Sequence, residues 1–214
     1  MVSPGEVVSV VGANGAGKTT LLKILATLQL PDSGKVLVDG QDALVRPRRY
    51  RKLLGYLPER IALYDDMTVR EYLRYRAILK GEQSKRVRRR VSEAVEICRI
   101  GDILRTPIAS LSAGLKKRVA IADAMILRPR ILLLDDFLAG LDHSMRETAG
   151  TILSTVVAFS SVIVTGHELD DFSKWTTRFL VLRDGIVSAS VDTAGLDQQT
   201  LRERLGAALE GGGR

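Results

Sequence analysis

The stretch "VVSVVGANGAGKTTLL", residues 7–22, decides the fold of this chain. Four valines in its first five residues make a short apolar run, which is typical of a strand buried on both faces of a parallel sheet. Glycines follow, then Lys18 and two threonines, then leucines that begin a helical pattern. A loop with almost no side chains, ending in a lysine between a strand and a helix, indicates a binding site for phosphate.

The loop "GANGAGKT", residues 12–19, satisfies the phosphate-binding pattern G-x-x-x-x-G-K-[ST]. Its glycines let consecutive backbone N–H groups curl round phosphates, Lys18 can reach the terminal ones, and the Thr19 hydroxyl can bind magnesium. A chance match in a turn is the alternative, and the flanking strand and helix argue against it. The residues expected to hold a nucleotide are Gly12, Ala13, Asn14, Gly15, Ala16, Gly17, Lys18, Thr19 and Thr20.

Two carboxylates follow a second buried strand in "ILLLDDF", residues 131–137. Asp135 stands at the carboxyl end of that strand and is expected to hold the magnesium, directly or through its water shell. The alternative is a solubilising carboxylate in a turn. Asp136 is then free to orient a water molecule.

The remaining pattern predicts an α/β fold. Short apolar runs at 7–11, 131–135 and 161–165 alternate with helical patterns, and Asp184-Gly185 marks a hairpin over 179–191 at the edge of the sheet. The strand-poor block at about 60–127 predicts a helical lobe inserted into a core of about 1–59 and 128–192. A C-terminal helix and tail, 193–214, complete one three-layer domain, and the tail "EGGGR" is expected to be disordered.

Composition limits the setting. The chain has 214 residues, 45% of them hydrophobic, and one cysteine, Cys98, which cannot form an internal disulfide and so favours a reducing cytosolic compartment. Neither a membrane span nor a signal peptide is evident. The net charge of +7 would suit a polyphosphate, an anionic membrane face or nucleic acid. In the basic run 84–90, valines at helical spacing place the arginines on the opposite, solvated face, so we expect no nucleic acid.

Five motifs in order resemble those of ATP-binding cassette (ABC) proteins. They are the Walker A loop (12–19), "LSAGLKKRVAIADAMI" (111–126) resembling the signature, the Walker B strand (131–135), "AGLD" (139–142) resembling the D-loop, and "TGHELDD" with His167 resembling the switch histidine. The resemblance implies a P-loop NTPase fold, the cofactors ATP and Mg²⁺, and His167 as a hydrogen-bond donor to the γ-phosphate. A helix-capping or surface histidine is the alternative for His167.

The signature also implies a partner. Ser112 can cap the helix that starts near Gly114, and a helix N-terminus with free N–H groups binds anions. In the family this segment meets the nucleotide of a second subunit, so the resemblance implies a homo- or heterodimer of cassettes. The plain alternative is a capped helix.

The chain departs from the family pattern at three points. Only 11 residues precede Gly12, so the usual N-terminal strands and adenine-stacking aromatic are expected to be missing. "GYLPER", 55–60, resembles the Q-loop with Glu59 in place of glutamine; Glu59 is assigned to magnesium and catalysis, with a surface glutamate as the alternative. Asp136 stands where the family usually has glutamate, and its shorter stem would misplace the attacking water by about 1 Å, which can slow a reaction by roughly 10²-fold.

The resemblance therefore implies an export-type ABC transporter ATPase, slow in turnover, on the inner face of the cell membrane beside a multi-span permease. Two alternatives remain open: a degenerate cassette that binds ATP as a switch, and a soluble ABC protein acting on ribosomes or DNA.

Overall fold

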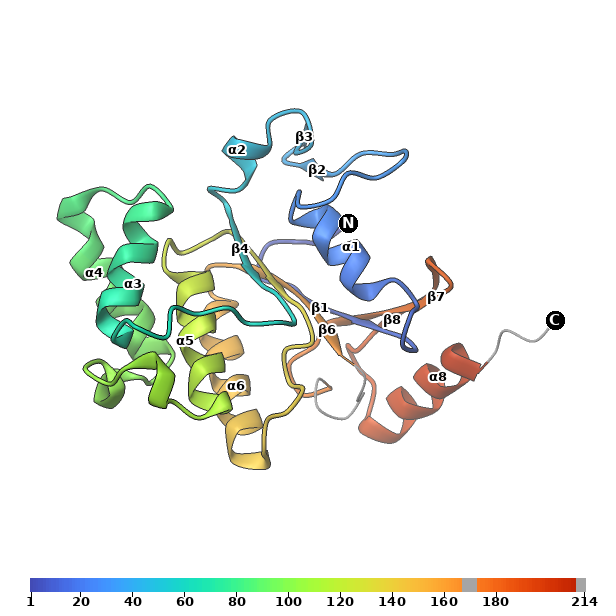
Figure 1. Ribbon diagram of the computed structural model, residues 1–214. Helices are drawn as coiled ribbons and strands as arrows, with labels where there is room; N and C mark the ends of the chain where they lie inside the picture. The colour runs from blue at the N-terminus through green and yellow to red at the C-terminus, as the bar shows by residue number, and fades with distance from the viewer. Residues whose placement is uncertain (167–172, 211–214) are drawn as a thin grey trace.

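The computed structural model describes residues 1–166 and 173–210, apart from the side chains at 143, 144 and 210. Its centre is a six-stranded sheet in the order β4-β5-β6-β1-β7-β8 (Figure 1). The strands are β1 (Val7–Val11), β4 (Leu54–Leu57), β5 (Ile131–Leu134), β6 (Ser161–Gly166), β7 (Arg178–Arg183) and β8 (Ile186–Asp192). All neighbours pair in parallel except β7 and β8, which form the predicted antiparallel hairpin at the edge. The α/β prediction is confirmed.

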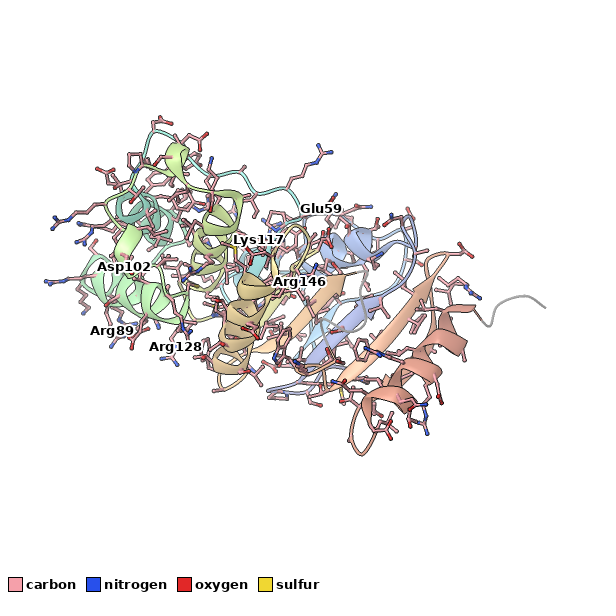
Figure 2. The ribbon with its side chains drawn as sticks, turned by 90° about the horizontal axis from the view of Figure 1, so that it is seen from below. Glu59, Arg89, Asp102, Lys117, Arg128 and Arg146 are labelled. Carbon is pink, nitrogen blue, oxygen red and sulfur yellow. The ribbon has the colours of Figure 1, made fainter. Side chains whose placement is uncertain are left out.

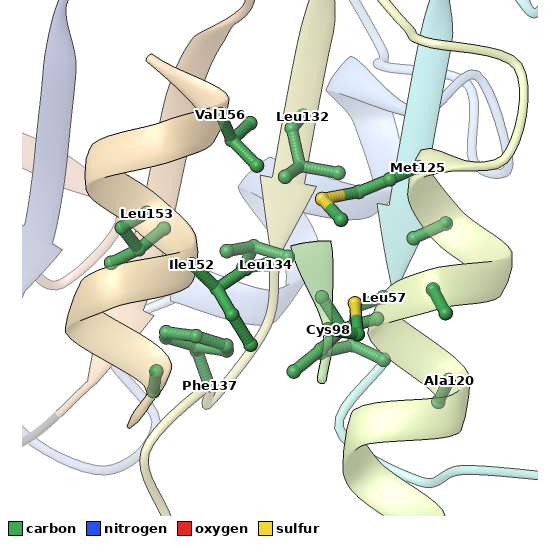
Figure 3. Close-up of a cluster of buried hydrophobic side chains, with 14 of the residues drawn as sticks. Leu57, Cys98, Ala120, Met125, Leu132, Leu134, Phe137, Ile152, Leu153 and Val156 are labelled. Carbon is green, nitrogen blue, oxygen red and sulfur yellow. The ribbon is translucent and has the colours of Figure 1, made fainter. Parts of the chain in front are cut away.

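Helices cover both faces of the sheet. On one face lies α1 (Lys18–Leu25), whose Leu22 packs against Leu133 of β5. Leu132 and Leu134, the residues on either side of Leu133 in β5, point to the other face of the sheet. There they pack beneath α5 (Ala113–Met125) and α6 (His143–Val156) (Figure 3). This alternation explains why the strand is apolar at every position.

One glycine sets how closely α5 approaches the sheet. A Cβ atom on Gly55 of β4 would lie 2.3 Å from the carbonyl oxygen of Ala124. That separation is much shorter than a van der Waals contact, and a backbone oxygen cannot rotate aside as a side chain can. A larger residue at position 55 would therefore force the whole of α5 away from β4.

From 60 to 127 the described chain is helical, with one isolated β-bridge. This lobe holds α3 (Val69–Leu79), α4 (Ser84–Ile97), the short 3₁₀ turns η1 (Gly101–Ile103) and η2 (Ile108–Ser110), and α5 (Figure 1). Thr68 and Glu71 form the predicted capping box at the start of α3. The predicted apolar face of α4 is buried, and its exposed basic side chains, such as Arg89, point outward (Figure 2).

A buried carboxylate fastens α3 to α5. Asp123, 8% exposed, accepts two hydrogen bonds from Arg76 Nε at 3.0 and 3.1 Å and forms an ion pair with Lys80 at 2.8 Å. Arg76 belongs to α3 and Lys80 is the C-cap residue directly after it, whereas Asp123 belongs to α5. The cluster therefore fixes how the two helices of the lobe lie against each other.

The peripheral elements are small. The hairpin β2 (Leu37–Val38) and β3 (Gln41–Asp42) and the short helix α2 (Pro47–Tyr50) follow α1. The helical pattern in "TTLLKILATLQL" predicts a helix over 19–30, but α1 ends at Leu25. Thr27 adopts a left-handed φ of 56° and binds Arg51 through its hydroxyl and carbonyl. At the other end of the sheet, α8 (Gln198–Glu210) packs on β7 and β8 (Figure 1). No helix in the described ranges is long and apolar enough to cross a membrane.

Candidate nucleotide-binding site

The loop between β1 and α1 is held close to the neighbouring strand. A Cβ atom on Gly12 would lie 2.1 Å from the carbonyl oxygen of Leu182 in β7, so only glycine fits there. Gly15 and Gly17 adopt φ values of 82° and 100°, which side chains at these positions would strain. The loop thus requires glycine for backbone approach and curvature, as the pattern predicted.

Lys18 folds back over this loop. Its ammonium donates to the carbonyl oxygens of Gly12 at 2.7 Å and Ala13 at 2.9 Å. Burial lowers the pKa of Lys18, and the Asp136 and Asp135 carboxylates partly oppose this effect. The lysine is therefore held at the mouth of the loop and lies within the field of both acids.

The loop opens into a polar cleft of about 260 Å³. Glu59, which follows β4, and Asp136, which follows β5, both line this cleft. They lie together because neighbouring parallel strands end at the same edge of a sheet. The lining residues are Asn14, Gly15, Gly17, Lys18, Thr19, Thr20, Glu59, Asp136 and Thr165. Gly12 and Ala13 contribute through their bonds to Lys18, and Ala16 is buried beneath the loop.

Asp135 lies behind the cleft, bound to two hydroxyl groups. Its Oδ1 accepts hydrogen bonds from Thr19 at 3.1 Å and from Thr165 at 2.8 Å. At 1% exposure it is no solubilising turn residue, so that alternative is wrong. Its Oδ2 atom is buried and accepts no hydrogen bond from the described residues, an unusual state for a carboxylate oxygen.

Asp136 adopts an uncommon backbone conformation, with φ at 48°. Aspartate tolerates this left-handed region better than most residues that carry a side chain. Its N–H donates to the Thr165 hydroxyl at 2.9 Å, and its side chain reaches the cleft. One threonine therefore aligns both acids.

Glu59 is exposed and lines the cleft from the loop after β4 (Figure 2). Burial and the Asp135 and Glu59 carboxylates raise the pKa of Tyr56 to about 12. Glu59 and Asp135 therefore both act on the same tyrosine. The exposure of Glu59 also suits a surface glutamate, so its role in binding magnesium and in catalysis stays a prediction.

Ser112 and Gly114 lie elsewhere. The Ser112 hydroxyl caps α5 by accepting the N–H of Leu115 at 3.3 Å, and neither residue lines the cleft. Gly114 is buried against α6, where a Cβ atom would lie 1.9 Å from the Met145 sulfur. His167 lies outside the described residues, so the structure leaves its predicted role untested.

Two residues of the site were missed from the sequence. Thr165 is the penultimate residue of β6, two residues before His167, and its place at the shared edge of the parallel strands was a usable signal. Lys117 of α5 donates to the carbonyls of Asp136 at 3.0 Å and Ala139 at 2.8 Å. In the sequence it is one of three successive basic residues, with nothing to set it apart.

Comparisons with known proteins agree with this geometry. The family model described as ABC transporter matches residues 1–139. The chain is 32% identical over 186 residues to a spermidine/putrescine import ATP-binding protein, PotA, of Marinobacter nauticus, covering 86% of this chain and 49% of that protein. It is 30% identical to the uncharacterised ABC transporter ATP-binding protein YxlF of Bacillus subtilis, covering 92% and 65%.

Solved structures are similar over most of the chain. An ATP-binding subunit of an ABC transporter superposes with a TM-score of 0.81 at 28% identity, covering 96% of this chain and 84% of the other. A dimeric ABC cassette, MJ0796, bound to ADP and Pi in a post-hydrolysis state gives 0.79 at 25% identity, covering 92% and 89%. The chain spans about half to two thirds of the length of the two curated relatives.

Proposed function

Since this chain belongs to the ABC transporter family, we propose that it binds ATP with magnesium, hydrolyses the ATP to ADP and phosphate, and so drives transport through membrane subunits. The observation that carries this proposal is the alignment of Asp135 and Asp136 by the single hydroxyl of Thr165, at the mouth of the phosphate loop. A loop that only bound phosphate would not require two acids aligned beside it.

The residues present fit a magnesium ion. The free Oδ2 of Asp135 and the Thr19 hydroxyl are oxygen donors of the kind that magnesium prefers. No cluster of three or more His, Cys, Asp or Glu side chains capable of holding a metal occurs in the described part of the chain, so the remaining ligands would be phosphate oxygens and water. When bound, magnesium would neutralise charge on the phosphates during hydrolysis.

The protein's own groups take separate roles. The loop N–H groups and Lys18 hold the phosphates, and Asp136 accepts a hydrogen bond from the attacking water. Glu59 and His167 are proposed to complete the site from the loops after β4 and β6, Glu59 toward the magnesium and His167 toward the γ-phosphate. Because the side chain of Asp136 is one methylene shorter than that of glutamate, hydrolysis is slow.

A second cassette is needed for a complete site. Ser112 and the start of α5 lie away from the cleft of their own chain, which supports a role at the nucleotide of another subunit. A solved structure similar to this chain is a dimer of bacterial cassettes. We therefore propose a dimer closed by two ATP molecules.

The membrane partner would dock on the helical lobe. Tyr75, Ile78 and Leu79 of α3 are each 42–58% exposed and lie on one side of the helix, with Tyr64 packed edge-on against Tyr75 at 5.8 Å between ring centroids. This apolar surface supports contact with a permease, and we propose that the chain lies on the inner face of the membrane. The relatives that name a direction are import proteins, so the export type expected from the sequence is not supported.

Association in solution tests the proposal. Asp136→Asn should bind ATP without consuming it, and its apparent mass should double on addition of ATP with magnesium, or rise by one partner cassette in a mixture. Ser112→Arg, which places a bulky cation at the start of α5, should bind ATP but remain monomeric. Unchanged mass for both proteins, alone and with candidate partner cassettes, would count against the sandwich.

A further inference from the structure

Lys117 is a buried lysine with no part in binding phosphate. It belongs to α5 (Figure 2) and is 8% exposed. Its ammonium donates to the carbonyl oxygens of Asp136 at 3.0 Å and Ala139 at 2.8 Å. Burying a lysine is unfavourable, and burial lowers the pKa of Lys117, although the Asp136 carboxylate raises it. If this position were needed only for packing, an apolar residue would fill it at lower cost. The two hydrogen bonds therefore indicate that Lys117 holds the loop that follows β5.

That loop is the one that aims Asp136. The Asp136 N–H is fixed by Thr165 and its carbonyl by Lys117, so both backbone groups of this left-handed residue are held. The two peptide planes set the direction of the Cα–Cβ bond. A short carboxylate has little freedom to correct an error in that direction, so the placement of its backbone decides where its oxygens lie.

The backbone of Lys117 belongs to the second turn of α5, close to the start of this helix. Ser112 caps this helix five residues earlier, about 7.5 Å along the axis. Gly114 packs directly against Met145 of α6, so the first turn of α5 lies against the helix that follows the loop. A shift of the α5 start would therefore carry the Lys117 ammonium, and with it the carbonyls of Asp136 and Ala139.

We propose that Lys117 is a positioning residue that joins the start of α5, which faces the nucleotide of a second cassette, to the water-orienting Asp136 of its own cleft. This inference rests on the proposed function for its catalytic part. The holding of the loop by Lys117 is a property of the single chain and is testable without any ATPase activity.

The test compares Lys117→Met, which keeps the length of the lysine stem up to the ε position but donates no hydrogen bond, with Lys116→Met as control. Lys116 is the preceding residue and makes an ion pair with the exposed Asp65. Amide hydrogen exchange over 136–142 should be at least tenfold faster in Lys117→Met and unchanged in Lys116→Met. Steady-state phosphate release should show kcat reduced about 10–100-fold in Lys117→Met, with KM for ATP within twofold of wild type.

A third variant separates positioning from folding. Lys117→Gln keeps a donor nitrogen on a shorter side chain, so its kcat should lie between those of wild type and Lys117→Met, and it carries the test if Lys117→Met does not fold. Unchanged exchange in 136–142, or an unchanged kcat in a variant of an active wild type, would overturn the inference. A wild type that binds ATP without releasing phosphate would instead overturn the proposed function, while the exchange result still decides whether Lys117 holds the loop.

Discussion

Replacing Thr165 with valine should damage both acids of the site at once. Valine has the shape of threonine without its hydroxyl, so packing around this 1%-exposed side chain is kept. The change removes the donor to Asp135 Oδ1 at 2.8 Å and the acceptor for the Asp136 N–H at 2.9 Å. Asp135 would keep the 3.1 Å bond from Thr19 and the neighbouring Tyr56 hydroxyl, while its Oδ2 lacks a donor among the described residues.

The expected loss can be worked from these two bonds. A hydrogen bond to a charged group contributes about 1.5–3 kcal/mol, and an unpaired buried N–H costs about 1–3 kcal/mol. Because the Asp136 N–H is only partly buried, water can replace part of its bond, and we expect a total near 3 kcal/mol. For a domain of this size that lowers the melting temperature by about 6–12 °C.

Circular dichroism melting without nucleotide measures the first effect, and the magnesium dependence of phosphate release measures the second. Removing a group that orients a metal ligand typically weakens metal affinity by about 10–100-fold, so half-maximal activity should need correspondingly more magnesium. Thr155→Val is the control, because Thr155 is exposed and its hydroxyl bonds to the carbonyl of Thr151 in its own helix. A Thr165→Val protein with wild-type melting and magnesium dependence would refute the reasoning.

Two further changes test separate parts of the account. Lys18→Ala should weaken ATP binding at least about tenfold, since it removes the one side-chain cation that lines the cleft among the described residues; unchanged affinity for a fluorescent ATP analogue would contradict the phosphate-loop assignment. Asp123→Asn should destabilise the protein by about 2–3 kcal/mol. This is less than the full cost of breaking a buried ion pair, because the side chains of Arg76 and Lys80 are about a quarter exposed. As control, Asp39→Asn at the exposed ion pair with Arg130 should cost under about 1 kcal/mol. Equal melting temperatures for these two variants would exclude a special role for the buried cluster.

Every strand of the main sheet except β4, together with the phosphate loop, could be predicted from the sequence because local rules determine them. An unbroken apolar run such as 131–134 is typical of burial on both faces, and the loop glycines match backbone conformations that side chains strain. The capping box of Thr68 and Glu71 is equally local. Each of these features depends on residues within a few positions of one another.

The missed features depend on contacts between distant segments. Lys117 binds carbonyls 19 and 22 residues away, and backbone carbonyls leave no trace in the sequence. The left-handed conformation of Asp136 follows from the turn after β5, not from a pattern around it. The early end of α1 depends on Arg51, which lies 24 residues after its partner Thr27. Such contacts become visible only when the fold brings the segments together.

The central claim, that this chain hydrolyses ATP through Asp136, is tested most directly by steady-state phosphate release at saturating ATP and magnesium from wild type, Asp136→Asn and Asp136→Glu. The account predicts slow but measurable release by wild type, none above background by Asp136→Asn, and release by Asp136→Glu faster by up to about 10²-fold as the longer acid reaches the water. The glutamate variant should also be less stable by about 1 kcal/mol, because glutamate tolerates a φ of 48° less well than aspartate. If all three proteins bind ATP and none releases phosphate above background, even with membrane partners present, the chain is a nucleotide switch and the claim is wrong.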